Sequence, residues 1–477
     1  MKNKKQSICF IIVAFLLLQF SCTTPPIDEP IVEQPDSDTT HVPIVEQPIT
    51  DTTQVLAYMY DIVALPEYNL EISTAEWNKF LTYFDQNPNN EEYILAACTV
   101  TKQKIEHKFA TVGMRLRGNT SRRRAEGLKG EMHNPIAPDW HHASFTVKFN
   151  KYNKAQKFLG QEKIILKWFK DDALYAREVY CYDLFERFGV WTAPQSSYCK
   201  LTIRIKEDAN AAYFGVYQLI EPIDEDYLRN RTTQFVDING FLWKGNYGAD
   251  FNNSDKNRMG LEKITLTSTY EPVYDLKTNS ANLEAAKTQL AEFIDNVRTK
   301  SGDDFKQWIQ QRTDVELLLK TYAVNVMCGM WDDYWNNCNN FYFYFDTAGK
   351  FWFIPYDYDN TLGTSLLMTD AGKRDPLNWG KSSNPLIKKI ISIPEFQTIY
   401  KNQLKSLGDS TQNYFNAKQS IPRIQKWHKL IQNHIVNDTE EDMSIQDVPA
   451  SWGNCSFYRL LSNENNFFKT KVSYIPQ

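Results

Sequence analysis

Alternating and continuous apolar runs between residues 55 and 250 predict a part of the chain that is rich in strands. Such runs predict strands at 93–100, 109–116, 144–150, 163–169, 200–205, 213–221 and 241–245. Ser73 and Glu76 form a capping box, which predicts a short helix through about Phe84. A longer helix is predicted from near Asp171 and Asp172 to Gly189. Together these elements predict a mixed sheet with one prominent helix.

Beyond about residue 280, apolar residues recur at the spacing of helices. Residues 283–297 carry one such face, and Val315–Met330 is a second long apolar helix. Further helices are predicted at 384–405 and 421–436. The expected fold class is therefore α+β, with a β-rich lobe at 55–250 followed by a mainly helical lobe at 251–477. A cleft between the two lobes is where we expect a ligand.

Two acidic clusters flank a predicted β-hairpin in the second lobe. The loop WDDYWNNCNN (331–340) precedes FYFYF (341–345), and FWFIPY (351–356) precedes DYDNTLG (357–363). With a turn centred near Ala348, Asn340 falls opposite Tyr356 and Asn337 opposite Asp359. Because paired strands lie about 4.8 Å apart, the loop and the acidic tail should emerge side by side. Carboxylates beside Asn amides suit a hard cation and a general base. The structural alternative is a calcium-stabilised loop, although DYDNTLG departs from the EF-hand pattern.

The N-terminus has the pattern of a bacterial lipoprotein signal. A lysine-rich start is followed by an apolar segment, 8–18, that is too short to span a bilayer. Ser21 and Cys22 then give a small residue before a cysteine, with Gln19 in place of the usual leucine. This pattern resembles the looser signals of Bacteroides-type lipoproteins. We expect residues 1–21 to be a signal peptide and Cys22 to carry the lipid anchor; ordinary cleavage and an uncleaved anchor are the alternatives.

Residues 22–54 are predicted to be a tether between the anchor and the folded part. The segment PIVEQPDSDTTHV (30–42) is repeated as PIVEQPITDTTQV (43–55). Frequent proline and little apolar mass favour an extended, semi-rigid segment over a packed one. The expected location is the cell envelope, most simply the outer membrane, on its periplasmic side or at the cell surface.

Charge, cysteine and histidine content narrow the function classes. A net charge of −5 gives no overall basic field, so no nucleic-acid partner is expected. The cysteines show no CxxC pair, and Cys181 and Cys328 lie on apolar helical faces, which predicts small buried thiols. The cluster of His133, His141 and His142 has no acidic partner at ligand spacing, so it is predicted to lie mostly at the surface.

Several ordered motifs carry a resemblance to a known family. These are RLRGNTSR, SFTVKF, FLGQEKIILKWFKDDALYAREVYCYDLFERFG, FGVYQLIEPID, NNFYFYFD, GKFWFIPYDYDNTLG and IPEFQTIYKNQL. They resemble the CotH family, kinase-like proteins first known from spore coats and found also as exported proteins and lipoproteins of other bacteria. The resemblance covers nearly all of 60–410. It implies a bilobed, atypical protein-kinase-like fold.

In the first lobe, the resemblance implies roles for three residues. Lys148, in the strand SFTVKF, resembles the lysine that meets the nucleotide phosphates, and Glu221 resembles the acidic residue that orients such a lysine. The chain has no GxGxxG run before Lys148, so Arg117 and the arginines that follow it could supply phosphate contacts instead. The plainer alternatives are an exposed strand lysine, a loop cap at Glu221 and an ordinary turn at 117–119.

In the second lobe, the resemblance implies the catalytic and metal-binding residues. Asp332 takes the place of the catalytic aspartate, and Asn337 follows at the five-residue interval that separates base and metal-binding Asn in kinases. Asp333 is the alternative base. Asp357, and next to it Asp359, resemble the metal aspartate after the hairpin. The implied cofactors are Mg²⁺ or Mn²⁺, with ATP as phosphoryl donor.

Two main function classes follow from these residues. The first is an exported kinase that transfers the γ-phosphate of ATP to a protein or another cell-surface acceptor. The second is a kinase-like scaffold that binds a surface glycan or protein without turnover, and a carboxylate-based hydrolase is a third, weaker alternative. Little ATP is expected outside the cytoplasm, which is the main objection to the first class.

Overall fold

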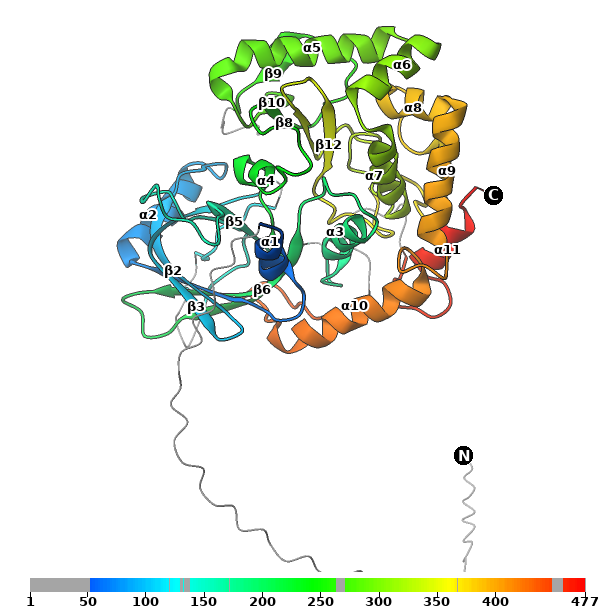
Figure 1. The fold of residues 1–477 in the computed structure, drawn as a ribbon. Helices are drawn as coiled ribbons and strands as arrows, with labels where there is room; N and C mark the ends of the chain where they lie inside the picture. Colours follow the sequence, from blue (N-terminus) through cyan, green and yellow to red (C-terminus); the bar gives the residue numbers. More distant parts are fainter. Residues whose placement is uncertain are drawn as a thin grey trace, which may run out of the picture. The chain divides into compact units, whose positions relative to one another are not determined.

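The computed structural model describes residues 52–476 apart from 120, 129–131, 133–137, 171, 263–270, 367 and 448–457. The predicted signal peptide, the lipidation site at Cys22 and nearly all of the predicted tether lie outside the described residues, as do His133 and Cys455. Helix α1 (Thr52–Tyr60) begins within the last three residues of the predicted tether. Ile49–Gln477 form one compact unit, with strands prominent in its first part and helices in its second (Figure 1).

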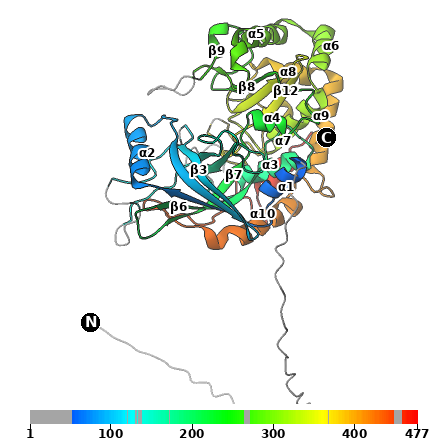
Figure 2. The same cartoon turned by 60° about the vertical axis from the view of Figure 1, so that its left-hand side comes forward.

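The first part of this unit is built around a closed barrel of strands (Figures 1 and 2). Its members are β1 (Glu67–Ile72), β2 (Ile94–Lys102), β3 (Ile105–Leu116), β4 (Phe145–Lys148), β5 (Lys163–Lys167), β6 (Ser196–Ile205) and β7 (Ala212–Ile220). They are ordered β1-β2-β3-β4-β5-β7-β6, and β1 closes the barrel by pairing in parallel with β6. The predicted mixed sheet is confirmed, whereas β1 and the closure were not predicted.

Side chains alternate between the inside and the outside of the barrel, as the two-residue period of strands requires. Phe145 and Val147 on β4 and Ile164 and Leu166 on β5 are buried in one core with the other inward residues. The intervening residues therefore point outward. Three lysines share this outer face of β4 and β5: Lys148, Lys163 and Lys167.

A β-bulge in β7 lies beneath a segment from the C-terminal region. The pairing of β6 with β7 shifts between Leu201 and Thr202, next to Gly215, whose φ is +79°. A Cβ at Gly215 would lie 2.8 Å from Cγ2 of Val436 and 3.1 Å from the carbonyl oxygen of His434. The hydroxyl of Tyr213 donates to the same carbonyl at 3.2 Å. Glycine thus permits both the bulge conformation and the close approach of the chain at 434–436.

A second sheet of five strands has the order β12-β11-β8-β10-β9. Its strands are β8 (Phe241–Gly245), β9 (Met259–Gly260), β10 (Tyr274–Leu276), β11 (Phe341–Phe345) and β12 (Phe351–Pro355). Phe341 pairs with Pro355 and Phe343 with Phe353, so the predicted hairpin register is confirmed. Because β8 pairs with β11, it belongs with the hairpin and not with the barrel strands among which it was predicted.

Helices surround the second sheet and flank the barrel. They are α2 (Thr74–Gln86), α3 (Arg177–Arg187), α4 (Glu225–Arg229), α5 (Leu283–Thr299), α6 (Gly302–Arg312), α7 (Val315–Met327), α8 (Pro385–Ser392), α9 (Pro394–Gly408), α10 (Ala417–Ile431) and α11 (Phe467–Ser473). The predicted helices at 73–84 and 315–330 are confirmed. The predicted helix 384–405 is two helices, because Pro394 starts a new one.

Helix α3 begins later than predicted. The carboxylate of Asp172 accepts hydrogen bonds from the backbone N–H groups of Ala176 and Arg177 at 2.9 and 2.8 Å. It therefore holds the first turn of a helix that starts at Arg177. Arg177 itself is buried and pairs with Asp172 at 2.5 Å. The helix ends at Arg187, and Gly189, which has a φ of +77°, follows the C-cap residue as predicted.

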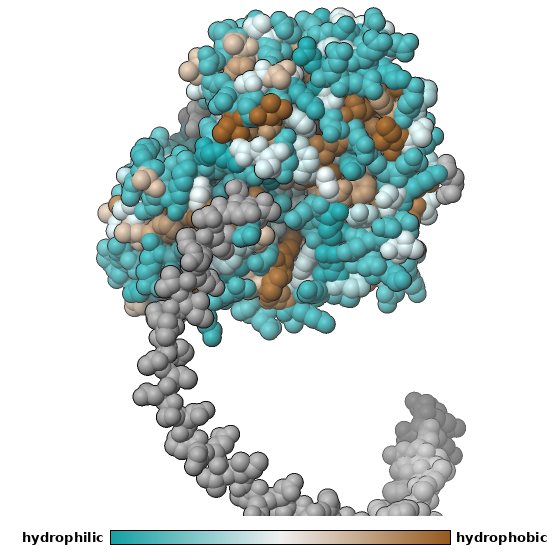
Figure 3. Space-filling model, viewed as in Figure 1, coloured by the Kyte–Doolittle hydropathy of each residue, from teal (hydrophilic) through white to brown (hydrophobic). Residues whose placement is uncertain are grey.

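Aromatic and aliphatic side chains lie mainly inside, in two large clusters. Large exposed apolar side chains are scattered, and the face in Figure 3 is mostly hydrophilic with small separate apolar patches. Cys181 and Cys328 are buried free thiols, as predicted. Among the residues that the structure describes, no helix has the length and apolar character needed to cross a bilayer.

Because the segment 434–436 lies against Gly215, adding a methyl group at this position should destabilise the fold more than at other glycines with a similar φ. Gly215→Ala should lower the free energy of unfolding by about 2–4 kcal/mol, because strain at positive φ adds to a collision with Val436. Gly160 has a nearly identical φ of +81°, but an added methyl group there would meet nothing within 4 Å. Gly160→Ala should therefore cost only about 1–2 kcal/mol. Urea unfolding of both variants measures the difference, and equal losses would show that the segment does not press on β7.

Candidate active site

Lys167, the last residue of β5, is the centre of the acidic site. Its Nζ lies 2.6 Å from Oε2 of Glu178 on α3, 2.7 Å from Oδ1 of Asp357 and 3.0 Å from Oδ2 of Asp359. Lys167 and Glu178 are almost fully buried, whereas about a third of each aspartate side chain is exposed. One ammonium group thus joins the barrel, α3 and the segment that follows the hairpin.

These contacts set the protonation of the group. Burial alone lowers the pKa of Lys167, but Asp357, Asp359 and Glu178 outweigh burial and hold this pKa well above its ordinary value. Burial likewise acts to raise the pKa of Asp357, and Lys167 reverses the effect, so that this carboxylate stays ionised. Burial and the charge of Asp357 raise the pKa of Asp359. The two aspartates therefore differ: Asp357 carries the charge, and Asp359 gives up its proton less readily.

Helix α3 also fixes the backbone of the acidic segment. Oε1 of Glu178 accepts a hydrogen bond from the N–H of Tyr358 at 3.0 Å, and the hydroxyl of Tyr182 accepts one from the N–H of Asp357 at 3.0 Å. Asp357 has a φ of +65°, a conformation that non-glycine residues rarely adopt and that is common at functional sites. The side chain of Asp357 is thus presented by a backbone that two residues of α3 hold in place.

Asp332 is surrounded by side-chain amides of its own loop. Oδ1 accepts hydrogen bonds from Asn337 at 2.6 Å and Asn339 at 3.3 Å, and Oδ2 accepts one from Asn340 at 2.9 Å. Burial is the largest cause that raises the pKa of Asp332, to about 6, with a further contribution from the charge of Asp357 and against the effect of the amides. A half-buried carboxylate with a pKa near neutrality is suited to accept a proton.

Asp333, the alternative base, is instead part of the framework of the loop. It is buried; Oδ2 accepts from the amide of Asn325 on α7 at 2.7 Å, and Oδ1 accepts from the N–H of Asn336 at 3.0 Å. Asn325 also accepts a hydrogen bond from the hydroxyl of Tyr358 at 2.7 Å. A chain of hydrogen bonds thus runs from Glu178 through Tyr358 and Asn325 to Asp333. This chain fixes the loop relative to the acidic segment, which favours Asp332 over Asp333 as the reactive carboxylate.

Asn337 and Asp357 have the oxygen atoms that a hard cation prefers. The Nδ2 of Asn337 donates to Asp332. The Oδ1 of Asn337 has no hydrogen bond to the described residues. Oδ1 of Asp357 contacts Lys167, and its Oδ2 likewise has no described partner. Carboxylate and amide oxygens are the usual protein ligands of Mg²⁺ and Mn²⁺. The donor set therefore fits such an ion, with Asp359 as a further carboxylate beside it.

Lys148 and Glu221 are not brought together. Lys148 lies on the same outer face as Lys167, but it pairs with Lys163, four residues before Lys167 and so about 13 Å away along β5. Among the described residues, it has no hydrogen bond or ion pair to a carboxylate. Glu221 is fully buried and accepts two hydrogen bonds from Arg231, at 2.8 and 2.7 Å. Lys167 forms an ion pair with Glu178 instead, and the partner of Glu221 is Arg231.

Arg117 is the one arginine of RGNTSRRR (117–124) that reaches the acidic site. Its NH2 donates to the hydroxyl of Tyr356 at 2.6 Å. Burial acts to lower its pKa, but Tyr356 and Asp357 raise it above its ordinary value. Arg122 pairs with Glu91, Arg123 with Asp438 and Glu441, and Arg124 with Asp85. These three arginines are already paired with carboxylates. Of the arginines expected to contact phosphate, only Arg117 therefore stays a candidate.

Lys244 on β8 is a cation of the site that the sequence did not indicate. It lies opposite Tyr342 of the hairpin and Asp275 of β10 in the register of the second sheet. Burial lowers its pKa, with a further lowering by Lys277, while Glu262, Asp275 and Asp357 act in the opposite direction. Among the described residues, Lys244 makes no hydrogen bond or ion pair.

A family model described as CotH kinase protein matches residues 114–471. The chain belongs to this family. The match starts later than the predicted resemblance, at Met114, and extends beyond it, to Lys471. Membership of the family supports a kinase-related function for the chain. A comparison with curated proteins gave no match.

The matched region contains Lys167 and Glu178, which sequence reasoning missed. The run KIILKWF was interpreted as a continuous apolar strand, and its two lysines were not considered. The signal was nevertheless present: Lys167 ends a strand that leads directly into a helix carrying Glu178. A strand lysine paired with a glutamate of the following helix is an arrangement that protein kinases use.

The contacts of Glu221 predict that it is structural. Glu221→Gln should lower the free energy of unfolding by about 3–5 kcal/mol, because Arg231 is then left buried without its counter-charge. Glu92 is exposed and serves as the matched control. Glu92→Gln should change stability by less than about 0.5 kcal/mol. Denaturant unfolding measures both, and a Glu221→Gln variant as stable as Glu92→Gln would return Glu221 to the list of functional candidates.

Proposed function

We propose that the protein is an exported phosphotransferase that moves the γ-phosphoryl group of ATP to a hydroxyl group of a protein or another surface acceptor. The observation that carries this proposal is the ion pair of Lys167 with Glu178 and Asp357. A strand lysine, a helix glutamate and an aspartate after a hairpin are the three groups that protein kinases assemble around nucleotide phosphates. Family membership supports the same class of activity.

The cations of the site would hold the phosphates of ATP. Lys167 is positioned by Glu178, and Arg117 and Lys244 add positive charge beside Asp357. Charge neutralisation is the main requirement of phosphoryl transfer, because negative charge is spread over the transferred group. Three cations, on β5, directly after β3 and on β8, would bind the phosphates in a chain without a GxGxxG loop.

Asn337 and Asp357, with Asp359 beside them, would hold Mg²⁺ or Mn²⁺. When bound, such an ion would neutralise the negative charge that develops on the transferred phosphoryl group. In the structure, the ammonium group of Lys167 contacts both aspartates. With substrate bound, the phosphates would become the partners of Lys167, and the aspartates would keep a cationic partner in the ion.

Asp332 would position the acceptor. Its carboxylate would accept the proton of the attacking hydroxyl group while the acceptor oxygen bonds to the γ-phosphorus and the bond to the ADP oxygen breaks. The amides of Asn337, Asn339 and Asn340 hold this carboxylate in one orientation. In this proposal the barrel and the helical part act as the two lobes of a kinase-like protein, anchored to the cell envelope through Cys22.

Two lysines on one face of the barrel give a matched test of the site. Lys167→Met should lower transfer of labelled phosphate from ATP by at least about 100-fold, because a charge at the phosphates is lost. Lys148→Met should retain near-wild-type transfer. Lys167→Arg keeps the charge and serves as the folded variant, with circular dichroism as the check. Equal loss in Lys148→Met and Lys167→Met would contradict this assignment.

Two aspartate variants separate catalysis from binding. Asp357→Ala should abolish metal-dependent binding of ATP, whereas Asp332→Asn should bind ATP with Mg²⁺ or Mn²⁺ and fail to transfer phosphate. Calorimetry and label incorporation, into a surface-protein extract or the protein itself, measure the two steps. Binding without transfer in the wild-type protein under either metal would support the scaffold function. Calcium binding without nucleotide binding would support a structural ion.

The lipid anchor has its own test. Cys22→Ser should move the protein from the membrane fraction to the soluble envelope fraction after signal cleavage, because an acyl chain is the attachment that this proposal assigns. Fractionation and immunoblotting measure the shift. Retention of the cleaved variant in the membrane fraction would show attachment by another route.

A further inference from the structure

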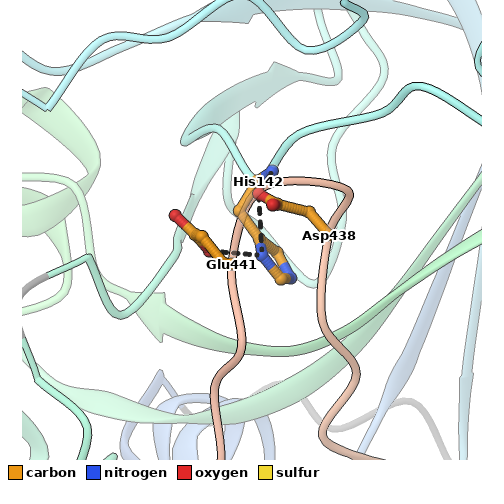
Figure 4. Close-up of side chains that lie close together, drawn as sticks. All are labelled: His142, Asp438 and Glu441. Carbon is orange, nitrogen blue, oxygen red and sulfur yellow. Dashed lines mark hydrogen bonds and ion pairs between the residues drawn. The ribbon is translucent and has the colours of Figure 1, made fainter.

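A second polar cluster lies on the barrel, formed by residues far apart in the chain (Figure 4). His142 precedes β4, and Asp438 and Glu441 follow α10. The Nδ1 of His142 lies 3.1 Å from Oε2 of Glu441 and 3.5 Å from Oδ2 of Asp438. Side chains of His142 and Asp438 are almost fully buried, and that of Glu441 is 20% exposed. The prediction that His141 and His142 lie at the surface is wrong, because their acidic partners come from the other end of the sequence.

The hydrogen bonds of His142 determine what its Nδ1 can do. Nε2 lies 3.0 Å from the carbonyl oxygen of Phe214, which can only accept, so Nε2 carries a hydrogen. In the neutral ring, Nδ1 then presents a lone pair to two carboxylates, which is repulsive. A positive species at Nδ1 removes the repulsion, and both a proton and a metal ion are of this kind. A histidine whose other nitrogen donates to a backbone carbonyl is the usual arrangement of a metal ligand.

The net charge around the cluster is negative, which favours binding of a divalent cation. Asp438, Glu440 and Glu441 all contact Arg123, which supplies one positive charge against three negative ones. Nδ1 of His141 accepts a hydrogen bond from NH2 of the same guanidinium group at 3.0 Å, and its Nε2 lies 3.6 Å from Oδ1 of Asp139. Burial acts to lower the pKa of His142, and Asp438 and Glu441 raise it above its ordinary value. With the ring neutral, the contacts of Arg123 leave a deficit of two positive charges.

We propose that His142, Asp438 and Glu441 bind a divalent transition-metal ion of the zinc class that fastens the segment 434–441 to the barrel. One imidazole nitrogen and two carboxylate oxygens are a ligand set that zinc accepts, with water completing the shell. Ligand atoms bonded at about 2.0–2.2 Å around a tetrahedral ion are separated by about 3.3 Å. The observed separations of 3.1 and 3.5 Å match that spacing, and all three ligand atoms lie within 4.8 Å of one another.

The neighbours of the cluster support its ligands. NH1 of Arg123 contacts Oε1 of Glu441 at 2.8 Å, the oxygen that does not face His142, and so orients this carboxylate. The ring of Trp168 stacks on His142 with centroids 5.7 Å apart, which fixes the ring plane. The partial exposure of Glu441 gives an entry route for the ion and a position for water. These are the outer contacts that metal sites commonly use.

The consequence of the ion is mechanical. The segment already meets the barrel at Gly215, and the N–H of Thr439 donates to the carbonyl of Trp140 at 3.2 Å. Arg123 belongs to the same loop as Arg117, which contacts Tyr356 at the candidate active site. An ion at the cluster would hold this loop and the segment together. The site is separate from Asn337 and Asp357, and the inference does not depend on phosphoryl transfer.

Zinc titration of the purified full chain tests the proposal. Asp357→Asn is used as the background, so that an ion at the candidate active site does not contribute. In this background, calorimetry should detect one Zn²⁺ per chain with at least a tenfold weaker affinity in Glu441→Gln. Glu440→Gln alters the adjacent exposed carboxylate, which contacts Arg123 and not His142, and should leave the affinity unchanged. His142→Asn is a second variant that removes the nitrogen ligand.

Two readouts decide between a metal and a proton. Zn²⁺ should raise the melting temperature of the Asp357→Asn background and of its Glu440→Gln variant but not of its Glu441→Gln variant, and Co²⁺ should give visible absorption that needs His142. Equal Zn²⁺ binding in all variants would overturn the proposal. The proposal would also be overturned if Zn²⁺ left the melting temperature unchanged and stability fell as the pH rose above neutrality. That result would show that Nδ1 of His142 binds a proton and not a metal ion.

Discussion

The structure depends on a single buried ammonium group shared by three carboxylates. Lys167 brings β5, α3 and the segment after the hairpin to one point through Glu178, Asp357 and Asp359. Buried charges are stable only when they are paired. Removing one partner of such a pair leaves the other charge uncompensated and lowers the free energy of unfolding by about 3–5 kcal/mol. The capping of α3 by Asp172 and the register of the hairpin both serve to bring these groups together.

Features decided by neighbouring residues could be predicted from the sequence. The hairpin and its register follow from local pattern and turn chemistry, whereas the interval from Asp332 to Asn337 was indicated by the family resemblance. The choice between Lys148 and Lys167 could not be made in this way, because both point to the outer face of the barrel. Only the placement of α3 distinguishes them. The expected contact of Glu221 with Lys148 is absent for a related reason: Arg231, the partner of Glu221, follows helix α4, whose placement the pattern does not specify.

The histidines show the same limit over a longer range. Near His142, the sequence has no carboxylate at ligand spacing, and the prediction of surface residues followed from that observation. The structure supplies Asp438 and Glu441 from nearly 300 positions later. Spacing rules work for sites built on one or two adjacent elements. When a distant segment completes a site, the sequence near the first residue gives no sign of it. The available signal was a mostly acidic run, 438–442, near the end of the sequence.

The crossing of the barrel by residues 434–441 has a consequence for how the protein is made. A chain is synthesised from its N-terminus, so every barrel strand is made before the residues that cover Gly215 and neutralise Arg123. Contacts so distant in sequence form late, since a long loop must close first. Until the last part of the chain arrives, the barrel exposes an uncovered bulge and uncompensated charges, and partly folded chains of this kind are prone to aggregation. Residues 434–441 therefore complete the packing of the barrel, and a chain that lacks them would leave Gly215 uncovered and Arg123 without its carboxylate partners.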